Sequence, residues 1–195
     1  MRSSTTLGPT STTSPQPTTA ALTRRELIVA GGALIGGLAL APALHAQGAK
    51  LSKSTLAALA ESRIVYLSPL HPDGAESTCH GEVWFFVDGG DVIVGVDRER
   101  WKVRALKKGW DRARIWAADF GPVAEAGDKY RSAPQFEARG SFDAEPATFE
   151  RLMQAYAKKY AEGWGKWGPR FQKSYADGSR VLIRYTPVAE GPPRL

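Results

Sequence analysis

The chain has 195 residues, 24% of them charged, and a formal net charge of +6. Its single cysteine, Cys79, excludes an internal disulfide, and three histidines are too few for a zinc site of the usual composition. Basic residues are interspersed with acidic ones, so nothing resembles the basic stripe of a nucleic-acid-binding protein, and we expect no nucleic-acid partner.

Residues 1–46 are interpreted as an export segment. The first 21 residues are nearly all Ser, Thr, Pro, Gly and Ala, a composition typical of disorder. Arg24 and Arg25 then stand just before an apolar run over residues 27–44. Paired arginines ahead of a moderately apolar run predict a signal peptide of the twin-arginine type.

Small residues at the end of the apolar run favour cleavage after Ala43 or Ala46. A transmembrane anchor is the alternative, because the run approaches the length of about 20 residues that a span needs. The glycines within the run and the small residues that follow it favour a cleaved signal peptide over an anchor. We therefore expect the twin-arginine translocase as a partner during export, and a periplasmic or secreted domain formed by residues 47–195.

The mature part begins with a helix expected over 54–62, capped by Ser54. Asp88-Gly89-Gly90-Asp91 separates two apolar runs and predicts a β-hairpin. Both arms are apolar on both faces, so neither is expected in a solvent-exposed sheet, and the interior of a barrel or sandwich would explain this. The strands expected in chain order are 63–67, 82–87, 92–96, 112–120, 135–142 and 180–185, the last closed by Pro187.

Two more helices are expected. Asp97 would cap a basic helix that runs to Lys108. Pro146 would open another helix, which carries one apolar stripe and ends at Gly163. After it, a glycine-rich loop would carry three aromatic residues, which either plug the core or form a wall over a ligand: Trp164, Trp167 and Phe171.

The order of these elements is not an alternation of strands and helices, which argues against a doubly wound sheet. Six antiparallel strands with helices between them predict a mainly β (α+β) fold, a small antiparallel barrel with flanking helices. Chemistry is best placed at residues 92–106, where a strand leads into a basic helix. A helix N-terminus with Lys102 and Arg104 nearby could hold a phosphate monoester, and a solvated basic face is the alternative.

From about residue 62 to 187, the chain resembles the pyridoxamine 5′-phosphate oxidase-like split β-barrel proteins, which include flavin and deazaflavin oxidoreductases. The residues that carry the resemblance are 82–90, 92–94, the stretch 97–106 with Trp101-Lys102, and the final strand 180–187. The resemblance implies a six-stranded split barrel that forms a homodimer and binds FMN, or alternatively a deazaflavin coenzyme, between subunits.

The same resemblance places Lys102 on the cofactor phosphate, with Arg100 or Arg104 replacing a basic residue where this chain has Trp101. It places Thr78 to Glu82 along the flavin ring and Val94 to Asp97 beside the ribityl chain. The cofactor-binding residues so implied are Thr78, Cys79, His80, Glu82, Val94, Val96, Asp97, Trp101, Lys102 and Arg104. The implied function is FMN-dependent oxidoreduction of an unknown small-molecule substrate; non-catalytic flavin or haem binding, or a purely structural domain, are alternatives.

His80 is the candidate proton donor near the flavin ring, and a histidine that faces solvent at a strand end is the alternative. Glu82, two residues on, would share its strand face and could pair with His80, with Arg63 or with the cofactor. Cys79 is expected to be a small buried residue rather than a nucleophile.

Overall fold

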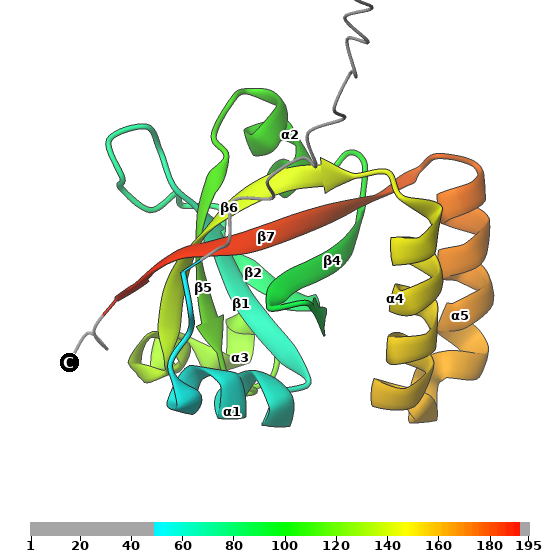
Figure 1. Cartoon of the computed structure of the whole chain (residues 1–195), viewed down its shortest axis with the longest axis horizontal. Helices are drawn as coiled ribbons and strands as arrows, with labels where there is room; N and C mark the ends of the chain where they lie inside the picture. The colour runs from blue at the N-terminus through cyan, green and yellow to red at the C-terminus, as the bar shows by residue number, and fades with distance from the viewer. Residues whose placement is uncertain (1–48, 192–195) are drawn as a thin grey trace, which may run out of the picture. The chain divides into compact units, whose positions relative to one another are not determined.

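The computed structural model describes residues 49–191, so the expected export segment with Arg24 and Arg25 lies outside the described residues. Seven antiparallel strands form one sheet in the order β2-β1-β5-β6-β7-β4-β3 (Figure 1). The strands are β1 (Ile64–Pro69), β2 (Gly81–Trp84), β3 (Phe86–Asp88), β4 (Asp91–Asp97), β5 (Arg112–Ala117), β6 (Gln135–Asp143) and β7 (Arg180–Gly191).

Helices flank the sheet. They are α1 (Lys53–Glu61), α2 (Trp101–Lys107), α3 (Val123–Ala126), α4 (Pro146–Lys159) and α5 (Ala161–Ala176), with a 3-10 turn at Lys129–Ser132. In Figure 1, α4 and α5 lie side by side against one flank, and α1 lies below the barrel. None of the helices within residues 49–191 has the length and apolarity needed to cross a membrane.

The two edges of the sheet are joined by a single residue, which closes it into a barrel. β2 pairs with β1 and β3 pairs with β4, yet only Phe85 separates β2 from β3. The Tyr160 hydroxyl accepts the Phe85 N–H at 3.0 Å, so this backbone donor is satisfied outside the ladder. The expected split barrel with flanking helices is confirmed, with seven strands instead of six because the run 82–87 is divided here.

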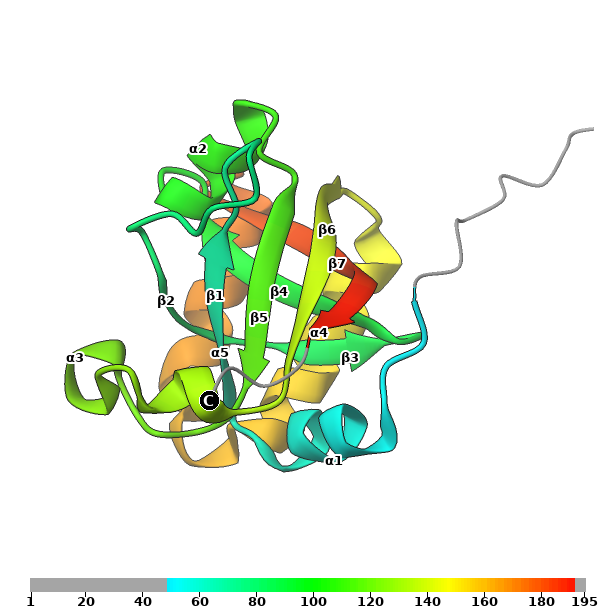
Figure 2. The same cartoon turned by 90° about the vertical axis from the view of Figure 1, so that its left-hand side faces the viewer.

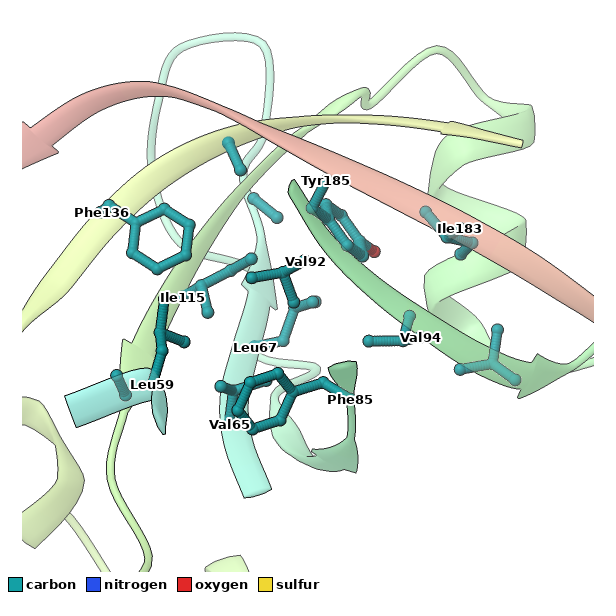
Figure 3. Packing of buried hydrophobic residues seen from close by; sticks show 14 of the residues in the cluster. Leu59, Val65, Leu67, Phe85, Val92, Val94, Ile115, Phe136, Ile183 and Tyr185 are labelled. Carbon is teal, nitrogen blue, oxygen red and sulfur yellow. The ribbon is translucent and has the colours of Figure 1, made fainter. Parts of the chain in front are cut away.

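The barrel interior is filled by side chains from all parts of the sheet. Figure 3 shows part of this cluster, in which aliphatic side chains lie among three aromatic rings, those of Phe85, Phe136 and Tyr185. A second apolar cluster lies outside the barrel, where Ile93 packs with Leu152 and Tyr156 of α4. This outer cluster explains why the hairpin arms are apolar on both faces, as their sequence indicated.

Several element ends differ from the expectation. Ser52, not Ser54, caps α1, because its hydroxyl accepts the Thr55 N–H at 3.2 Å. Asp97 does not cap a helix: its carboxylate accepts the Glu99 N–H at 2.9 Å, in a turn that delays α2 until residue 101. α2 therefore has only seven residues.

The last strand continues past Pro187, which was expected to close it. β7 reaches Gly191, and Pro187 lies opposite Ala138, where the β6–β7 register shifts. Proline has no N–H to donate to a ladder, so an irregularity of this kind accommodates it. β5, in contrast, ends at Ala117, three residues before its expected end.

The segment that was expected to be a glycine-rich loop is the helix α5. α4 ends at Lys159 rather than at Gly163, and α5 runs from Ala161 to Ala176 with Pro169 inside it. Phe171 is buried against Tyr156, with ring centroids 5.5 Å apart. Packing of an aromatic face thus outweighs the low helix propensity of three glycines and a proline, which local sequence cannot show.

Two glycines of α5 provide a test of this packing. A Cβ on Gly168 would come within 2.9 Å of the Trp164 ring, whereas a Cβ on Gly165 would meet nothing within 4 Å. We expect Gly168→Ala to lower the free energy of unfolding by about 1–3 kcal/mol through overpacking. We expect Gly165→Ala to raise it by about 0.5–1 kcal/mol, since alanine favours a helix. Urea unfolding of both variants measures the difference, and equal effects would contradict a packed helix.

Candidate functional site

A cleft of about 780 Å³ lies beside β2, within the range of about 300–1,000 Å³ typical of small-molecule sites. Figure 2 shows β2 running along this side of the barrel, between α2 and α3. The cleft is lined by residues of seven elements and their loops: Ile64, His80, Gly81, Glu82, Val83, Trp84, Gly95, Val96, Asp97, Arg100, Trp101, Lys102, Pro122, Val123, Ala124, Trp167, Phe171 and Arg180.

Lys102 is the most unusual residue of the cleft. Only 7% of it is exposed, and within residues 49–191 its ammonium makes no hydrogen bond or ion pair. It lies 4.1 Å from the centroid of the Trp101 ring and close to the backbone of Gly81. Burial lowers the pKa of Lys102 from 10.5 to about 8, which the nearby Glu82 partly opposes. Buried charges are normally paired, so this one indicates an anionic ligand.

Arg180 is a second cation in the cleft. Its Nη1 donates to the Gly95 carbonyl at 2.8 Å and its Nε to the Ser174 hydroxyl at 2.9 Å. The guanidinium carbon lies 4.0 Å from the centroid of the Phe171 ring. No carboxylate among the described residues forms an ion pair with Arg180. Desolvation by this environment lowers the pKa of Arg180.

One wall of the cleft is aromatic. Trp84 stacks on Tyr160 at 4.1 Å and lies edge-on to Trp167 at 6.2 Å, and its ring is parallel to that of Phe171 at 6.1 Å. Both expectations for the aromatic residues 164–171 are therefore partly met. Trp164 packs against the outer core, while Trp167 and Phe171 form a wall of the cleft.

Of the ten residues that the resemblance implies for cofactor binding, six line the cleft: His80, Glu82, Val96, Asp97, Trp101 and Lys102. The other four, Thr78, Cys79, Val94 and Arg104, do not line it. Val94 is fully buried in the barrel core. Arg104 is exposed and donates to the Glu99 carbonyl at 2.7 Å. Thr78 and Cys79 precede β2 on the surface, so the expectation of a buried cysteine is wrong.

Glu82 does not pair with the residues expected for it. Its carboxylate accepts the Val123 N–H at 3.0 Å and so holds the start of α3 beside β2. Arg63 instead lies 4.0 Å from Glu162. His80 precedes the first residue of β2, and its ring centroid is 6.2 Å from that of Tyr130. Both His80 and Glu82 nevertheless line the cleft.

Arg180 is the functional candidate that the sequence did not reveal. It opens β7 and pairs in register with Asp97, the last residue of β4. These residues are 83 positions apart in the chain, so only the pairing of the strands shows that Arg180 lies at the same cleft as Lys102. A cation at the first position of a strand was the one available signal.

No family model matches the chain, and no curated protein matches it. Its structural neighbours include split-barrel proteins of the pyridoxamine 5′-phosphate oxidase kind. One is a putative pyridoxamine 5′-phosphate oxidase from Listeria innocua, with 15% identity, a TM-score of 0.44, and coverage of 68% of this chain and 89% of that one.

Two further neighbours have other described roles. An F420 reductase shows 17% identity and a TM-score of 0.43, with 72% of this chain and 98% of that one covered. The haem storage protein HutZ from Vibrio cholerae shows 14% identity and a TM-score of 0.44, with 73% and 96% covered. At these values the likeness concerns the fold and carries no conclusion about cofactor or activity.

Proposed function

We propose that the domain is a flavin-binding oxidoreductase that uses FMN and acts on a small molecule. The observation that carries this proposal is the Lys102 ammonium, which is buried in a cleft with an aromatic wall and has no ion-pair partner within residues 49–191. A cofactor with a phosphate group would pair with the ammonium, and its flat, largely apolar ring would pack against the aromatic wall. Bound FMN would supply the electron transfer, while the protein supplies binding and electrostatics.

The residues of the cleft fit such a cofactor. Lys102 would hold the phosphate, with Arg100 at the rim as a second cation, since charge-assisted contacts are the stronger hydrogen bonds. His80 and Glu82 on the β2 side would lie along the ring, with His80 as the proton donor. Val96 would pack beside the ribityl chain. Arg104, which points away, is not part of this proposal.

The proposal extends to assembly and ligand identity. The cleft is open on the surface of one chain, and we propose that a second copy covers it in a homodimer. A deazaflavin coenzyme offers the same combination of phosphate and flat ring. Haem, which carries carboxylates and could be ligated by His80, is distinguished by its absorbance.

Titration of the purified protein with FMN and with riboflavin, which lacks the phosphate, tests the proposal. At pH 7 we expect FMN to bind roughly ten- to hundredfold more tightly, the value of one charge-assisted contact. Because the pKa of Lys102 is about 8, FMN affinity should fall about tenfold from pH 7 to pH 9 as the ammonium loses its proton. Riboflavin affinity should stay constant.

The control for the pH arm is the Lys102→Met variant, in which FMN affinity should not change with pH. Failure of the wild-type protein to bind FMN, a deazaflavin coenzyme or riboflavin contradicts the proposal. Binding of haem alone, with its intense violet band, would replace it with a haem-binding function.

We also propose that this domain acts in the periplasm or outside the cell. Support comes from the sequence of residues 1–46 and its paired arginines. Fractionation of cells that make the full chain tests this: Arg24→Lys with Arg25→Lys should retain the protein in the cytoplasm. Export that is unaffected by the double replacement would contradict the twin-arginine route.

A further inference from the structure

The cleft contains more cations than one phosphate contact uses. Lys102, Arg100 and Arg180 line it, against only two carboxylates, Glu82 and Asp97. Both carboxylates accept backbone N–H groups, those of Val123 and Glu99, and neither forms an ion pair with the three cations. Three cations against two carboxylates leave the lining with a formal net charge of +1, and none of the three cations is paired with a carboxylate of the cleft.

Lys102 and Arg180 belong to different parts of the cleft. The Lys102 amine lies against Gly81 of β2, whereas Arg180 is held by the carbonyl of Gly95 and by Ser174 of α5. The charge of Arg100 acts on both of them. Lys102 and Arg180 are thus held by different elements, and each can bind an anionic group of its own.

Arg180 is positioned as a recognition group. Among the residues that the structure describes, protein partners use two of its five N–H donors, which leaves three. Those two bonds and the face of Phe171 fix the plane of the guanidinium, so its unused donors are preorganised. A planar guanidinium with adjacent free donors matches the two oxygens of a carboxylate.

The surroundings of Arg180 favour a ligand whose carboxylate is attached to a flat apolar group. Phe171 lies beneath the guanidinium, and Trp167 and Trp84 continue the aromatic wall from it. Edge-to-face and stacked contacts with such a wall favour rings and other planar groups. Trp167 is among the more exposed large apolar side chains of the described residues, with 38% of it exposed.

We propose that the end of the cleft formed by Arg180, Phe171, Trp167 and Trp84 is a substrate site for a small planar carboxylate, separate from the phosphate site at Lys102. The site rests on the proposed function in one respect only, because it is called a substrate site on the premise that FMN occupies the Lys102 end.

Benzoate and benzamide are matched probes, since they share a ring and differ in charge. Titrations of the full chain, monitored by NMR or calorimetry with and without FMN, should show benzoate binding at least about tenfold more tightly than benzamide. In Arg180→Met this preference should disappear while FMN affinity stays within about twofold. Arg180→Lys, which keeps the charge without the fork, should retain only part of the preference.

Arg98→Met is the matched control, because Arg98 is exposed, does not line the cleft, and its loss changes net charge equally. It should leave both affinities unchanged. Equal binding of benzoate and benzamide to the wild-type protein overturns the inference. If Arg180→Met weakens FMN tenfold and riboflavin not at all, Arg180 belongs to the phosphate site, and the inference fails while the proposed function stands.

The proposed function can also fail while the inferred carboxylate site stands. If the wild-type protein binds no flavin but prefers benzoate through Arg180, the proposed function is wrong and the carboxylate site remains. Unfolding midpoints of all variants separate loss of binding from loss of structure. If Arg180→Met does not fold, the Arg180→Lys variant is the test of the inference. A benzoate preference in Arg180→Lys equal to that of the wild type would contradict a role for the guanidinium fork.

Discussion

Lys102→Met is expected to make the free domain more stable and to remove its phosphate site. Burial lowers the pKa of Lys102 from 10.5 to about 8. One pKa unit corresponds to about 1.4 kcal/mol, so the buried ammonium costs on the order of 3 kcal/mol at pH 7. Methionine keeps the apolar stem without the charge. A gain of roughly 3 kcal/mol would raise the unfolding midpoint by about 6–12 °C.

The pH dependence has a definite sign. The pKa of Lys102 is lower in the folded protein than in the unfolded chain, so the unfolded state binds more protons between about pH 8 and pH 10.5. Wild-type stability should therefore rise through this window and approach that of Lys102→Met. Urea unfolding at pH 7 and pH 10 measures the narrowing gap.

Lys107→Met provides the control for this prediction, because Lys107 is an exposed residue of the same helix. Its effect should stay within about 0.5 kcal/mol at both pH values. A Lys102→Met protein that is less stable than wild type at pH 7 would show that the ammonium has a structural partner. The assignment of Lys102 to a ligand would then be lost. Stability given up at a binding site is a common cost of function.

Arg184→Met should have the largest destabilising effect. The Arg184 guanidinium binds Asp143 through Nε at 2.9 Å, Asp91 through Nη1 at 2.9 Å and Asp88 through Nη2 at 3.0 Å. These carboxylates come from β6 and from both sides of the β3–β4 turn. Only 4% of the Asp143 side chain is exposed. Removing the cation leaves it buried and unpaired, at an expected loss of about 3 kcal/mol.

Arg139→Met is a matched control from β6. Arg139 forms an exposed ion pair with Asp111 at 3.4 Å, which should contribute less than about 1 kcal/mol.

Hydrogen bonds from Arg151 and Arg184 lower the pKa of Asp88 below its ordinary value. The stability that this adds is present at neutral pH and lost as pH falls below that ordinary value, about 4. The loss of unfolding free energy in Arg184→Met should therefore be smaller below about pH 4 than at pH 7. A loss below about 1 kcal/mol at pH 7 would contradict a stabilising role for the contacts of Arg184 with the three carboxylates.

The barrel could be predicted from the sequence because its signals are local. The Gly89-Gly90 turn carries positive φ at both residues, as a tight hairpin requires, and apolar runs mark the strands on each side. The division of the run 82–87 could not be predicted. It depends on Tyr160, which satisfies the Phe85 backbone from 75 positions away.

Part of the candidate site could likewise be predicted from the sequence, and part could not. Lys102 was singled out by the resemblance around residues 97–106, and its place in the cleft follows from the short α2. The helix cap at Asp97 was predicted wrongly because an Asx-type turn and a helix cap use the same side chain. Arg180 and Trp167 reach the cleft only through strand pairing and through a helix whose composition resembles a loop.

The central claim, that the buried ammonium of Lys102 is a phosphate site for a flavin, is tested most directly by one comparison. FMN and riboflavin are titrated at pH 7 into wild-type protein and into Lys102→Met. We expect FMN to be favoured roughly ten- to hundredfold by the wild type and bound no better than riboflavin by the variant. An FMN preference of the same size in both proteins would contradict the claim.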